Sequence, residues 1–354
     1  MSKVSVIIPI FNAGTKLHKC IKSVISQTFK EFELILVNDG STDESLEICN
    51  LYKKKDSRII VIDKENEGSI ATRRRGVEAA NYNYIMFVDA DDWIDSQILE
   101  VLYKNAIETD SDITVCNTYK TLGGFLPIRR FVKNMYLESE RVYSEDEIKK
   151  ELVVAYLHGH PFPASLFAKM YKKELVSSSG KYLEKISFLG DDLYYNLEML
   201  LKAKKVKTIN KPLYYYRIGG ITSKYMPYLF DDMINGYLIQ KEVILEHYEE
   251  TKEQRFDGIS IMLLNTFKTC LYNLVNSSYK DDEITMLIKE YVKHPVVLDC
   301  IENNGSKRYF SEEFLNAIIY QDIDYLYSLG KTIYKKRIVK NAVIKAYSKL
   351  AFIN

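Results

Sequence analysis

Two short acidic segments hold the residues best suited to chemistry. The first, FVDADDW at 87–93, places Asp89, Asp91 and Asp92 within four residues at the end of an apolar run. Carboxylates this close repel one another, and a folded protein tolerates them best when a cation or hydroxyl ligands occupy the site. Mg²⁺ and Mn²⁺ prefer such oxygen ligands and often bind diphosphate oxygens as well. A solvated acidic turn that caps the next helix is the alternative.

The second acidic segment, GDD at 190–192, begins a helical pattern. Asp191 and Asp192 can simply cap that helix, because carboxylates are favourable at a helix N-terminus. One of them can also act as a general base, which only has to lie within hydrogen-bond reach of the proton that it takes from a sugar hydroxyl. This segment alone leaves both alternatives open.

Two further segments carry groups suited to a nucleotide. VNDGSTD at 37–43 places Asp39 at the end of a buried strand, where its carboxylate can accept hydrogen bonds from a base edge or a ribose. A turn with a helix cap explains these residues equally well. ENEGSIATRRRG at 65–76 carries three consecutive arginines on a helical pattern. Successive helical residues point about 100° apart, so at most two of them face one crevice. There an arginine would form charge-assisted hydrogen bonds to a diphosphate.

The elements that must position these residues alternate between strand and helix patterns over the first 120 residues. We expect strands at 4–11, 32–37, 59–63, 84–89 and 112–119, and helices at 15–28, 46–52, 69–80 and 95–108. Such alternation predicts an α/β fold with a mostly parallel, Rossmann-like sheet flanked by helices. Ligands of such sheets bind outside the carboxyl ends of the strands. The NDGSTD and DADD segments should therefore meet at one crevice.

The rest of the chain divides into two parts. Residues 120–165 suggest loops over the crevice, followed by a strand at 165–171, a helix at 191–203 and the segment YYYR. Beyond residue 225 only helical patterns follow, at 229–249, 256–277, 282–292, 311–327 and 331–351. We therefore predict an α/β domain at 1–225 and a mainly α-helical C-terminal domain at 226–354.

Composition excludes several classes of protein. The 354 residues include 49 Lys and Arg against 48 Asp and Glu, a net charge of +1, which excludes a globally basic nucleic-acid binder. The five cysteines form no CxxC pair, which favours a reducing compartment. The N-terminal apolar run reads as a buried strand rather than a signal peptide. No apolar stretch approaches the roughly 18 residues that cross a bilayer. We expect a cytoplasmic protein whose membrane contact, if any, is peripheral.

Taken together, five motifs resemble those of the family 2 glycosyltransferases, which have the GT-A fold. The motifs are VSVIIPIFN, ILVNDGSTD, ENEGSIATRRRG, FVDADDW and GDDLYYNLEMLL with YYYR, and they cover residues 3 to about 225. The resemblance implies a metal-dependent transfer from a nucleotide sugar, usually a UDP-sugar, with inversion of the anomeric configuration. The implied cofactor is Mn²⁺ or Mg²⁺.

The same resemblance assigns roles to individual residues. It implies that Asp91 holds the metal together with Asp89, and that Asp191 and Asp192 are the catalytic acids, with Asp192 as the base. It implies donor contacts from Pro9, Phe11, Asn12, Asp39, Asn66, Arg73, Asp89 and Arg217. The lysine of the family's strand before the GDD motif corresponds to Lys169. The chain departs from the pattern at Arg74, where the family commonly has Asn, and at Asp191, where it has Glu.

The resemblance leads to a specific function. We expect transfer of glucose, galactose or an N-acetylhexosamine to a hydroxyl of a glycan, glycoprotein or lipid-linked oligosaccharide in bacterial surface glycan synthesis. A processive polysaccharide synthase would carry QxxRW, but the only tryptophan is Trp93, in DDW. A sugar nucleotidyltransferase needs a Gly-rich basic loop after the first strand, and IPIFNAGTK is a poor one. A catalytically inactive scaffold that binds a nucleotide sugar is the remaining alternative.

The C-terminal segment 331–354 contains seven basic residues and no acid. As a helix it is amphipathic, so it can rest on an anionic membrane surface. The alternative is a terminal helix that packs on the helical domain and exposes a basic face to solvent. The helical domain could also support an oligomer.

Overall fold

The computed structural model describes residues 4–122, 128–157, 159, 162–218 and 225–350. Within these residues one ten-stranded sheet has the order β3-β2-β1-β4-β9-β6-β10-β5, with β7 beside β6 and β8 beside β10. The strands are β1 Val4–Ile10, β2 Phe32–Asp39, β3 Ile59–Lys64, β4 Tyr84–Phe87, β5 Trp93–Ile94, β6 Ile113–Leu122, β7 Ile128–Phe131, β8 Arg141–Ser144, β9 Lys169–Lys172 and β10 Lys205–Arg217.

The four neighbouring strands β3, β2, β1 and β4 are parallel to one another. The NDGSTD segment lies at the end of β2, and the DADD segment follows β4. β1 pairs in parallel with β2 and β4, and β2 pairs in parallel with β3. β9 is antiparallel to both β4 and β6, whereas β10 runs parallel to β6. The predicted mostly parallel sheet is confirmed. The strand expected at 165–171 is shorter and begins at Lys169.

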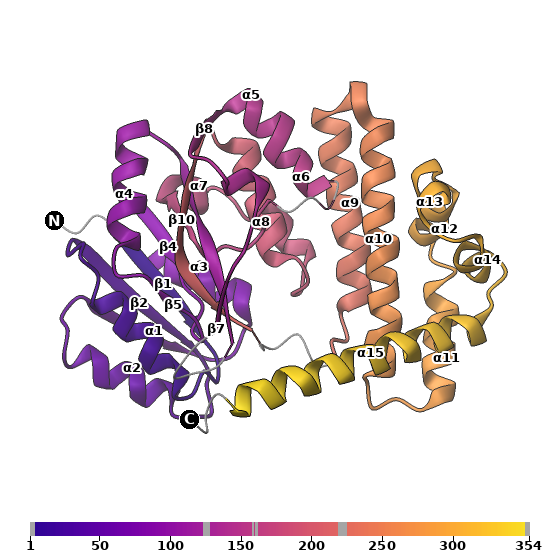
Figure 1. The fold of residues 1–354 in the computed structure, drawn as a ribbon, viewed down its shortest axis with the longest axis horizontal. Coiled ribbons are helices and arrows are strands. Elements are labelled where there is room, and N and C mark those ends of the chain that lie inside the picture. Colours follow the sequence, from indigo (N-terminus) through magenta and orange to yellow (C-terminus); the bar gives the residue numbers. More distant parts are fainter. Residues whose placement is uncertain (1–3, 123–127, 158, 160–161, 219–224, 351–354) are drawn as a thin grey trace.

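Helices cover both faces of the sheet (Figure 1). The core on one face gathers side chains from α1, α2 and α4, and the core on the other face gathers them from α3, α7 and α8. Because β1 is buried on both faces, it reads as a continuous apolar run. The bounds of these helices are α1 Lys16–Ile25, α2 Ser45–Lys53, α3 Ser69–Ala79, α4 Ile98–Thr109, α7 Lys173–Ser177 and α8 Asp191–Lys202.

Helix α3 lies unusually close to the sheet. A Cβ atom at Gly76 would stand 2.4 Å from Cγ2 of Ile7, a distance that real Cβ atoms do not reach. Glycine at this position therefore allows α3 to approach β1 directly. The close packing fixes where the N-terminal turns of α3, which include Arg73, lie relative to the strand ends.

The segment 120–165, for which the sequence predicts loops, contains regular structure in its described part. β7 pairs with β6, and β8 pairs with β10, so both add to the sheet. η1 Met135–Leu137 lies between β7 and β8, and β8 is followed by α5 Glu145–Glu147, the π-helical η2 Ile148–Val153 and α6 Val154–Leu157. η3 Lys181–Lys185 lies further along the chain. Most of the apolar residues of 148–157 are buried in the core, which explains why this segment is helical. Residues 158, 160 and 161 of the HGHPFPAS segment lie outside the described residues.

The described residues beyond 225 are helical, as predicted. Their elements are α9 Leu229–His247, η5 Glu249–Thr251, α10 Lys252–Val275, α11 Asp281–Tyr291, α12 Pro295–Glu302, α13 Asn304–Tyr309, α14 Glu312–Ile319 and α15 Ile323–Leu350. The sequence analysis missed α12 and α13, and it placed the last helix break at 328–330. The chain instead breaks near Gln321, whose φ of 55° is left-handed, so α14 ends at Ile319 and α15 begins at Ile323.

We call the sheet with its flanking helices, up to residue 218, the sheet domain, and the helices from residue 229 on the helical region. Helix α15 runs from the helical region back toward the sheet domain (Figure 1). Its first half packs on α10 and α11. The Arg337 guanidinium stacks over the ring of Tyr272 at 4.2 Å, and Lys331 Nζ lies 3.5 Å from Asp281 Oδ2. None of the helices in the described ranges is long and apolar enough to cross a bilayer.

Candidate active site

Three segments that are far apart in the sequence meet around the side chain of Arg73. The chain after β4 contributes Asp89, the first turn of α8 contributes Asp191 and Asp192, and α3 contributes the arginine itself. Arg73 Nη1 lies 2.9 Å from Asp191 Oδ2 and 3.5 Å from Asp192 Oδ1, and Nη2 lies 3.7 Å from Asp89 Oδ1. Three of the acids that the sequence singles out, Asp89, Asp191 and Asp192, therefore converge on one guanidinium.

Burial makes this cluster electrostatically costly. It raises the pKa of Asp89 to about 7, against the opposing effect of Arg73, and the neighbouring Asp192 and Asp91 carboxylates raise this pKa further. Burial likewise raises the pKa of Asp192 above its ordinary value. Burial alone would lower the pKa of Arg73, but the Asp192 and Asp191 carboxylates outweigh that effect and raise it. One permanent cation thus faces three carboxylates, so the site attracts further positive charge.

The two acids of the GDD segment differ in how far their oxygens are engaged. Asp191 Oδ2 accepts hydrogen bonds from Ser69 Oγ and Arg73 Nη1, both at 2.9 Å, and its Oδ1 accepts the backbone N–H of Asp192 at 2.8 Å. Asp192 Oδ2 accepts the backbone N–H of Leu166 at 3.1 Å. Asp192 Oδ1 is buried and has no hydrogen-bond partner among the described residues. The Asp192 side chain is also the more exposed, at 26% against 16% for Asp191.

The loop that contacts Asp192 is held in place by Lys169. This fully buried lysine donates to the carbonyl oxygen of Pro163 at 2.8 Å and also to that of Ser165. Burial lowers the pKa of Lys169 to about 7, while the Asp192 carboxylate acts in the opposite direction. The lysine thus fixes the turn that presents the Leu166 N–H to Asp192.

The acids that follow β4 have separate environments. Asp92 is buried and accepts the Arg217 backbone N–H at 2.7 Å and the Tyr214 hydroxyl at 2.9 Å. Burial raises the pKa of Asp92 to about 8, and the Asp89 carboxylate contributes in the same direction. The side chain of Arg217 donates from Nε to the backbone carbonyl of Asp91 at 2.7 Å. No hydrogen bond or ion pair from the described residues reaches the Asp91 carboxylate, which is only partly buried and so is open to a ligand.

Asp39 lies at the end of β2, as predicted, but its carboxylate is engaged within the protein. Oδ1 accepts the Glu67 N–H at 2.9 Å, Oδ2 accepts the Gly68 N–H at 3.0 Å, and Lys64 forms an ion pair with it. Burial would raise the pKa of Asp39, but the hydrogen bonds from Lys64 and Glu67 outweigh it and lower this pKa. Asp39 therefore fixes the turn that begins α3. Its contact with a base stays a prediction.

The remaining predicted donor residues lie at neighbouring strand ends. Pro9 is in β1, and Phe11 and Asn12 follow this strand directly, with exposed side chains. Asn12 adopts a φ of 48°, which turns the chain after the strand. Asn66 donates from Nδ2 to the backbone carbonyl of Asp39 at 3.0 Å. These residues share the edge at which the acids lie, and their contacts with a donor stay predictions.

The sequence analysis missed three residues that support the site, namely Lys64, Ser69 and Tyr214. Lys64 neutralises Asp39, Ser69 hydrogen-bonds Asp191, and the Tyr214 hydroxyl binds Asp92. The sequence did contain a signal for Ser69, because it follows a glycine at the start of a helical pattern, where hydroxyl side chains are common. No local pattern connects Tyr214 with Asp92, because the contact depends on how β10 pairs in the sheet.

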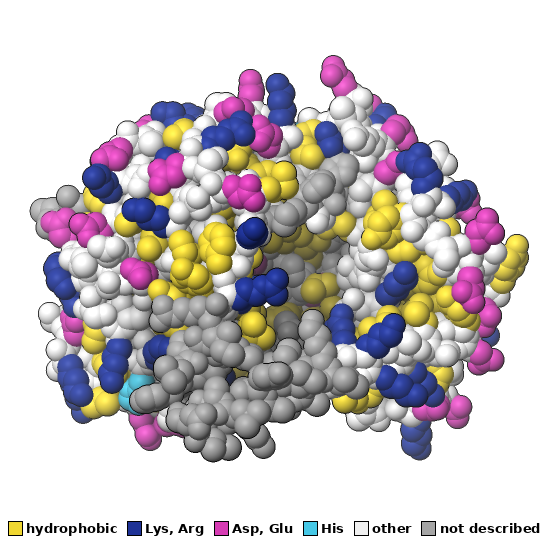
Figure 2. Space-filling model, viewed as in Figure 1, with side chains coloured by type: hydrophobic (Ala, Val, Ile, Leu, Met, Phe, Trp, Pro, Cys, Tyr) yellow, Lys and Arg dark blue, Asp and Glu magenta, His cyan; other side chains and the backbone are white. Residues whose placement is uncertain are grey.

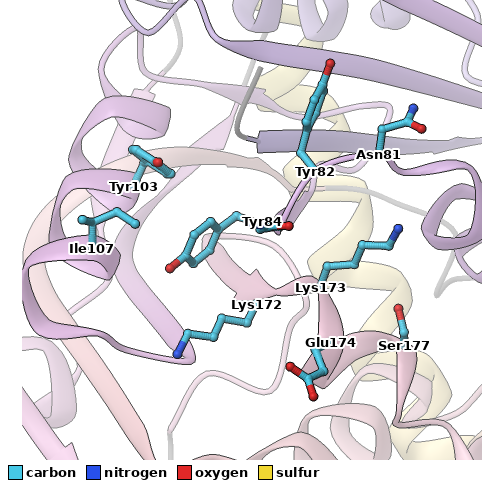
Figure 3. Close-up of a pocket in the computed structure, with 10 residues that line it drawn as sticks. Asn81, Tyr82, Tyr84, Tyr103, Ile107, Lys172, Lys173, Glu174 and Ser177 are labelled. Carbon is cyan, nitrogen blue, oxygen red and sulfur yellow. The ribbon is translucent and has the colours of Figure 1, made fainter. Parts of the chain in front are cut away.

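A hollow of ≈ 980 Å³ lies at the other end of the sheet, where β4 begins and β9 ends (Figure 3). Its lining includes the side chains of Tyr84, Tyr103 and Ile107 and the two lysines Lys172 and Lys173. Both lysines are already engaged, because Lys172 pairs with Asp110 and Asp112 and Lys173 donates to the carbonyl of Ala80. This hollow therefore lacks the acid cluster, and its cations are not free to bind a phosphate.

A GT-A type of α/β transferase is the class that this sheet and this acid cluster define. The sequence model of the family described as "Glycosyl transferase family 2" matches residues 5–174. The chain is 32% identical to the uncharacterized glycosyltransferase EpsJ of Bacillus subtilis, over 85% of this chain and 86% of EpsJ. The protein belongs to glycosyltransferase family 2.

Two further similarities are consistent with this assignment. The chain is 36% identical to the glycosyltransferase GlyA of Streptococcus pneumoniae over 65% of its length, although the match spans only 34% of GlyA. The crystal structure of S. aureus TarS 1–349 in complex with UDP-GlcNAc superimposes with a TM-score of 0.64 at 20% identity. That superposition covers 94% of this chain and 92% of TarS 1–349, so the two share their fold over nearly their whole lengths.

The position of Arg73 predicts a large effect on stability. Arg73→Gln should lower the free energy of unfolding by about 3 kcal/mol without donor or divalent metal, because it leaves three partly buried carboxylates uncompensated. The same substitution at the neighbouring, exposed Arg74 should change it by less than about 0.5 kcal/mol. Urea unfolding of both variants in EDTA measures the difference. A small and equal loss in the two variants would contradict this account of the cluster.

Proposed function

We propose that this protein transfers a sugar from a UDP-sugar to an acceptor hydroxyl in a single displacement that inverts the anomeric carbon. The observation that carries the proposal is Asp192, a carboxylate with a raised pKa and one oxygen without a hydrogen bond, beside the Arg73 guanidinium. The complex of TarS with UDP-GlcNAc supports a UDP-sugar as the donor class. The sugar is glucose, galactose or an N-acetylhexosamine, and the acceptor is a glycan, glycoprotein or lipid-linked oligosaccharide of the bacterial surface.

The reaction follows from the roles of the residues. The Asp192 carboxylate takes the proton of the acceptor hydroxyl, and the hydroxyl oxygen forms a bond to the anomeric carbon. The bond from this carbon to the diphosphate breaks at the same time, and UDP leaves. Burial raises the pKa of Asp192, which makes its carboxylate a stronger base than that of an exposed aspartate. The hydrogen bonds that occupy Asp191 make it a group that orients Arg73 rather than the base.

The residues after β4 suit a divalent cation. The Asp91 carboxylate is not engaged by the described residues, and the raised pKa of Asp89 reflects a charge that a cation would stabilise. No group of three His, Cys, Asp or Glu side chains in the described ranges forms a ready metal site. If a cation binds here, Asp91 and Asp89 would hold Mn²⁺ or Mg²⁺, and diphosphate oxygens and water would supply the remaining ligands. A cation bound there supplies charge stabilisation to the leaving diphosphate.

This face of the molecule also suits an anionic donor. Figure 2 shows a hollow between the sheet domain and the helical region, with Lys and Arg side chains along its edge. Positive charge around a concave surface raises the local concentration of anions such as a nucleoside diphosphate.

A donor screen tests the function itself. The full-length chain, with Mn²⁺, should release UDP from one or a few UDP-sugars and release much less nucleotide from GDP- and TDP-sugars. Nucleotide release by a coupled assay, with glycan and lipid-linked acceptors added in turn, measures this. Binding of UDP-sugars without release under every acceptor condition would instead indicate an inactive nucleotide-sugar-binding scaffold.

The assignment of the base predicts a difference between two adjacent acids. Asp192→Asn should reduce the transfer rate roughly 100- to 10,000-fold, because an amide cannot take the proton. Its affinity for UDP should stay close to that of the wild type. Initial rates and calorimetric UDP titrations measure the two quantities, with Asp191→Asn as the matched comparison. If Asp191→Asn is inactive while Asp192→Asn transfers sugar, the roles of the two acids are reversed.

Metal dependence is tested at Asp91. EDTA should abolish transfer, Mn²⁺ or Mg²⁺ should restore it, and Asp91→Asn should lower it on the order of a hundredfold, because leaving-group stabilisation is lost. The control is Asp95→Asn, since the carboxylate of Asp95 accepts a backbone N–H nearby, at Gln97. Rates over a range of Mn²⁺ concentrations distinguish the variants. Full wild-type activity in EDTA would rule out the metal.

We also propose that the C-terminal segment contacts anionic membranes, since Lys335, Lys336 and Ile338 are exposed on α15. Each basic residue near such a surface contributes about 1 kcal/mol. The full chain should cosediment with phosphatidylglycerol vesicles at low salt and dissociate at high salt. The double variant K335Q/K336Q should bind less, whereas K53Q/K54Q, which removes two exposed lysines of the sheet domain, should bind like the wild type. Absence of binding at low salt would eliminate the membrane role.

A further inference from the structure

A buried carboxylate of the helical region binds the segment that leads into the catalytic acids. Asp232 lies in the first turns of α9 and is 1% exposed. Its Oδ1 accepts the backbone N–H of Ser187 at 2.7 Å, and its Oδ2 accepts those of Phe188 at 2.9 Å and Leu189 at 2.7 Å. Three consecutive amides of the sheet domain therefore converge on one side chain of the helical region.

These amides directly precede the residues that carry the proposed chemistry. Gly190 follows them with a φ of 82°, and α8 begins at Asp191. The backbone must turn sharply here before the helix, and the hydrogen bonds to Asp232 fix the chain on the entry side of this turn. Hydrogen bonds to an ionised carboxylate are shorter and stronger than neutral ones. Without this acceptor, the three N–H groups would have to find other partners or stay unsatisfied.

A second contact, one turn further along α9, joins this helix to α8 itself. A Cβ atom at Gly236 of α9 would stand 1.9 Å from the Tyr194 hydroxyl, and one at Gly190 would stand 2.8 Å from Cε2 of the same ring. The buried Tyr194 ring of α8 thus fits between two glycines, one of them on α9. Helix α9 is the first helix of the helical region (Figure 1), and it contacts both the entry to α8 and its first turn.

We propose that Asp232 is a positioning residue for Asp191 and Asp192, so that the helical region forms part of the catalytic site rather than an appendage to it. This inference rests on the proposed transfer reaction for its kinetic consequence only. Asp232 does not touch the reacting groups. It holds the backbone from which both acids project, and a displacement of about 1 Å can cost on the order of a hundredfold in rate.

A purely structural role for Asp232 makes different predictions. It would join the two regions, and its loss would lower stability while the turnover of the folded fraction stayed unchanged. A positioning role lowers kcat in the folded enzyme and leaves donor affinity intact, because the strand ends after β1, β2 and β4 do not depend on α9. Measuring kcat and UDP affinity separately in the folded enzyme therefore distinguishes the two roles.

The test uses the full-length chain with Asp232→Asn. The amide keeps the size of the side chain, but it removes the charge and one acceptor oxygen. Its matched control is Glu242→Gln on the same helix, since Glu242 pairs with Lys181 and Lys185 of the preceding segment and not with the amides of 187–189. Hydrogen–deuterium exchange is measured for both variants over 187–192 and over 64–68, and kcat and UDP affinity are measured in parallel.

We expect Asp232→Asn to accelerate exchange at 187–192 but not at 64–68. We also expect it to lower kcat on the order of 10- to 100-fold while UDP affinity changes less than about twofold. Glu242→Gln should resemble the wild type in all three measurements. Unchanged exchange at 187–192 would overturn the proposal, and so would faster exchange with an unchanged kcat. If the wild type transfers no sugar, the proposed function fails, while the exchange experiment still decides whether Asp232 holds this segment.

If Asp232→Asn does not fold, Gly236→Ala provides an independent test. Its added methyl group displaces the Tyr194 ring, and hence the first turn of α8, while it leaves the Asp232 carboxylate in place. A folded Gly236→Ala enzyme with reduced kcat and normal UDP affinity supports the control of α8 by α9. A folded variant with wild-type kcat would overturn it.

Discussion

The partial neutralisation of three carboxylates by one largely buried arginine is the constraint on which the site depends. Asp89, Asp191 and Asp192 come from segments that would repel one another if Arg73 did not lie between them. The arginine is in turn held by α3, which packs closely against β1 through Gly76. Sheet packing, the position of the arginine and the electrostatics of the site are therefore coupled. The residual excess of negative charge is the basis for the divalent cation that we propose at this site.

The structure distributes the support for this cluster over several elements. The buried Asp39 carboxylate fixes the turn that begins α3 and so orients the arginine. Buried Lys169 holds the turn that contacts Asp192. Asp232 of α9 holds the chain that enters α8. Each of these groups holds a backbone segment that positions the acids.

The sequence was sufficient for β1, β2, β3, β4, β6 and β9, but it did not predict β5, β7, β8 or β10. Because parallel strands place their carboxyl ends at one edge, it placed the NDGSTD and DADD segments at the same edge. The strand pattern alone did not predict that the first turn of α8 meets Asp89 there. It could not distinguish Asp191 from Asp192, since the difference lies in partners such as Ser69 that only the packing of α3 against α8 supplies. The sequence also did not indicate the role of Asp232, because an acidic residue in the first turn of a helix is common there simply for its favourable interaction with the helix dipole. The break near Gln321 was misplaced for a similar reason, since a left-handed residue other than glycine has no strong sequence signal.

The most direct test of the central claim is a double-mutant cycle between Arg73→Gln and Asp191→Asn, measured by urea unfolding in EDTA. If the arginine stabilises the fold chiefly by neutralising these carboxylates, removing Asp191 should make the loss of Arg73 less damaging. The expected coupling free energy is about 1–3 kcal/mol, as for groups in one buried network. A coupling free energy near zero would contradict the account, because it would mean that Arg73 and the acids contribute to stability independently.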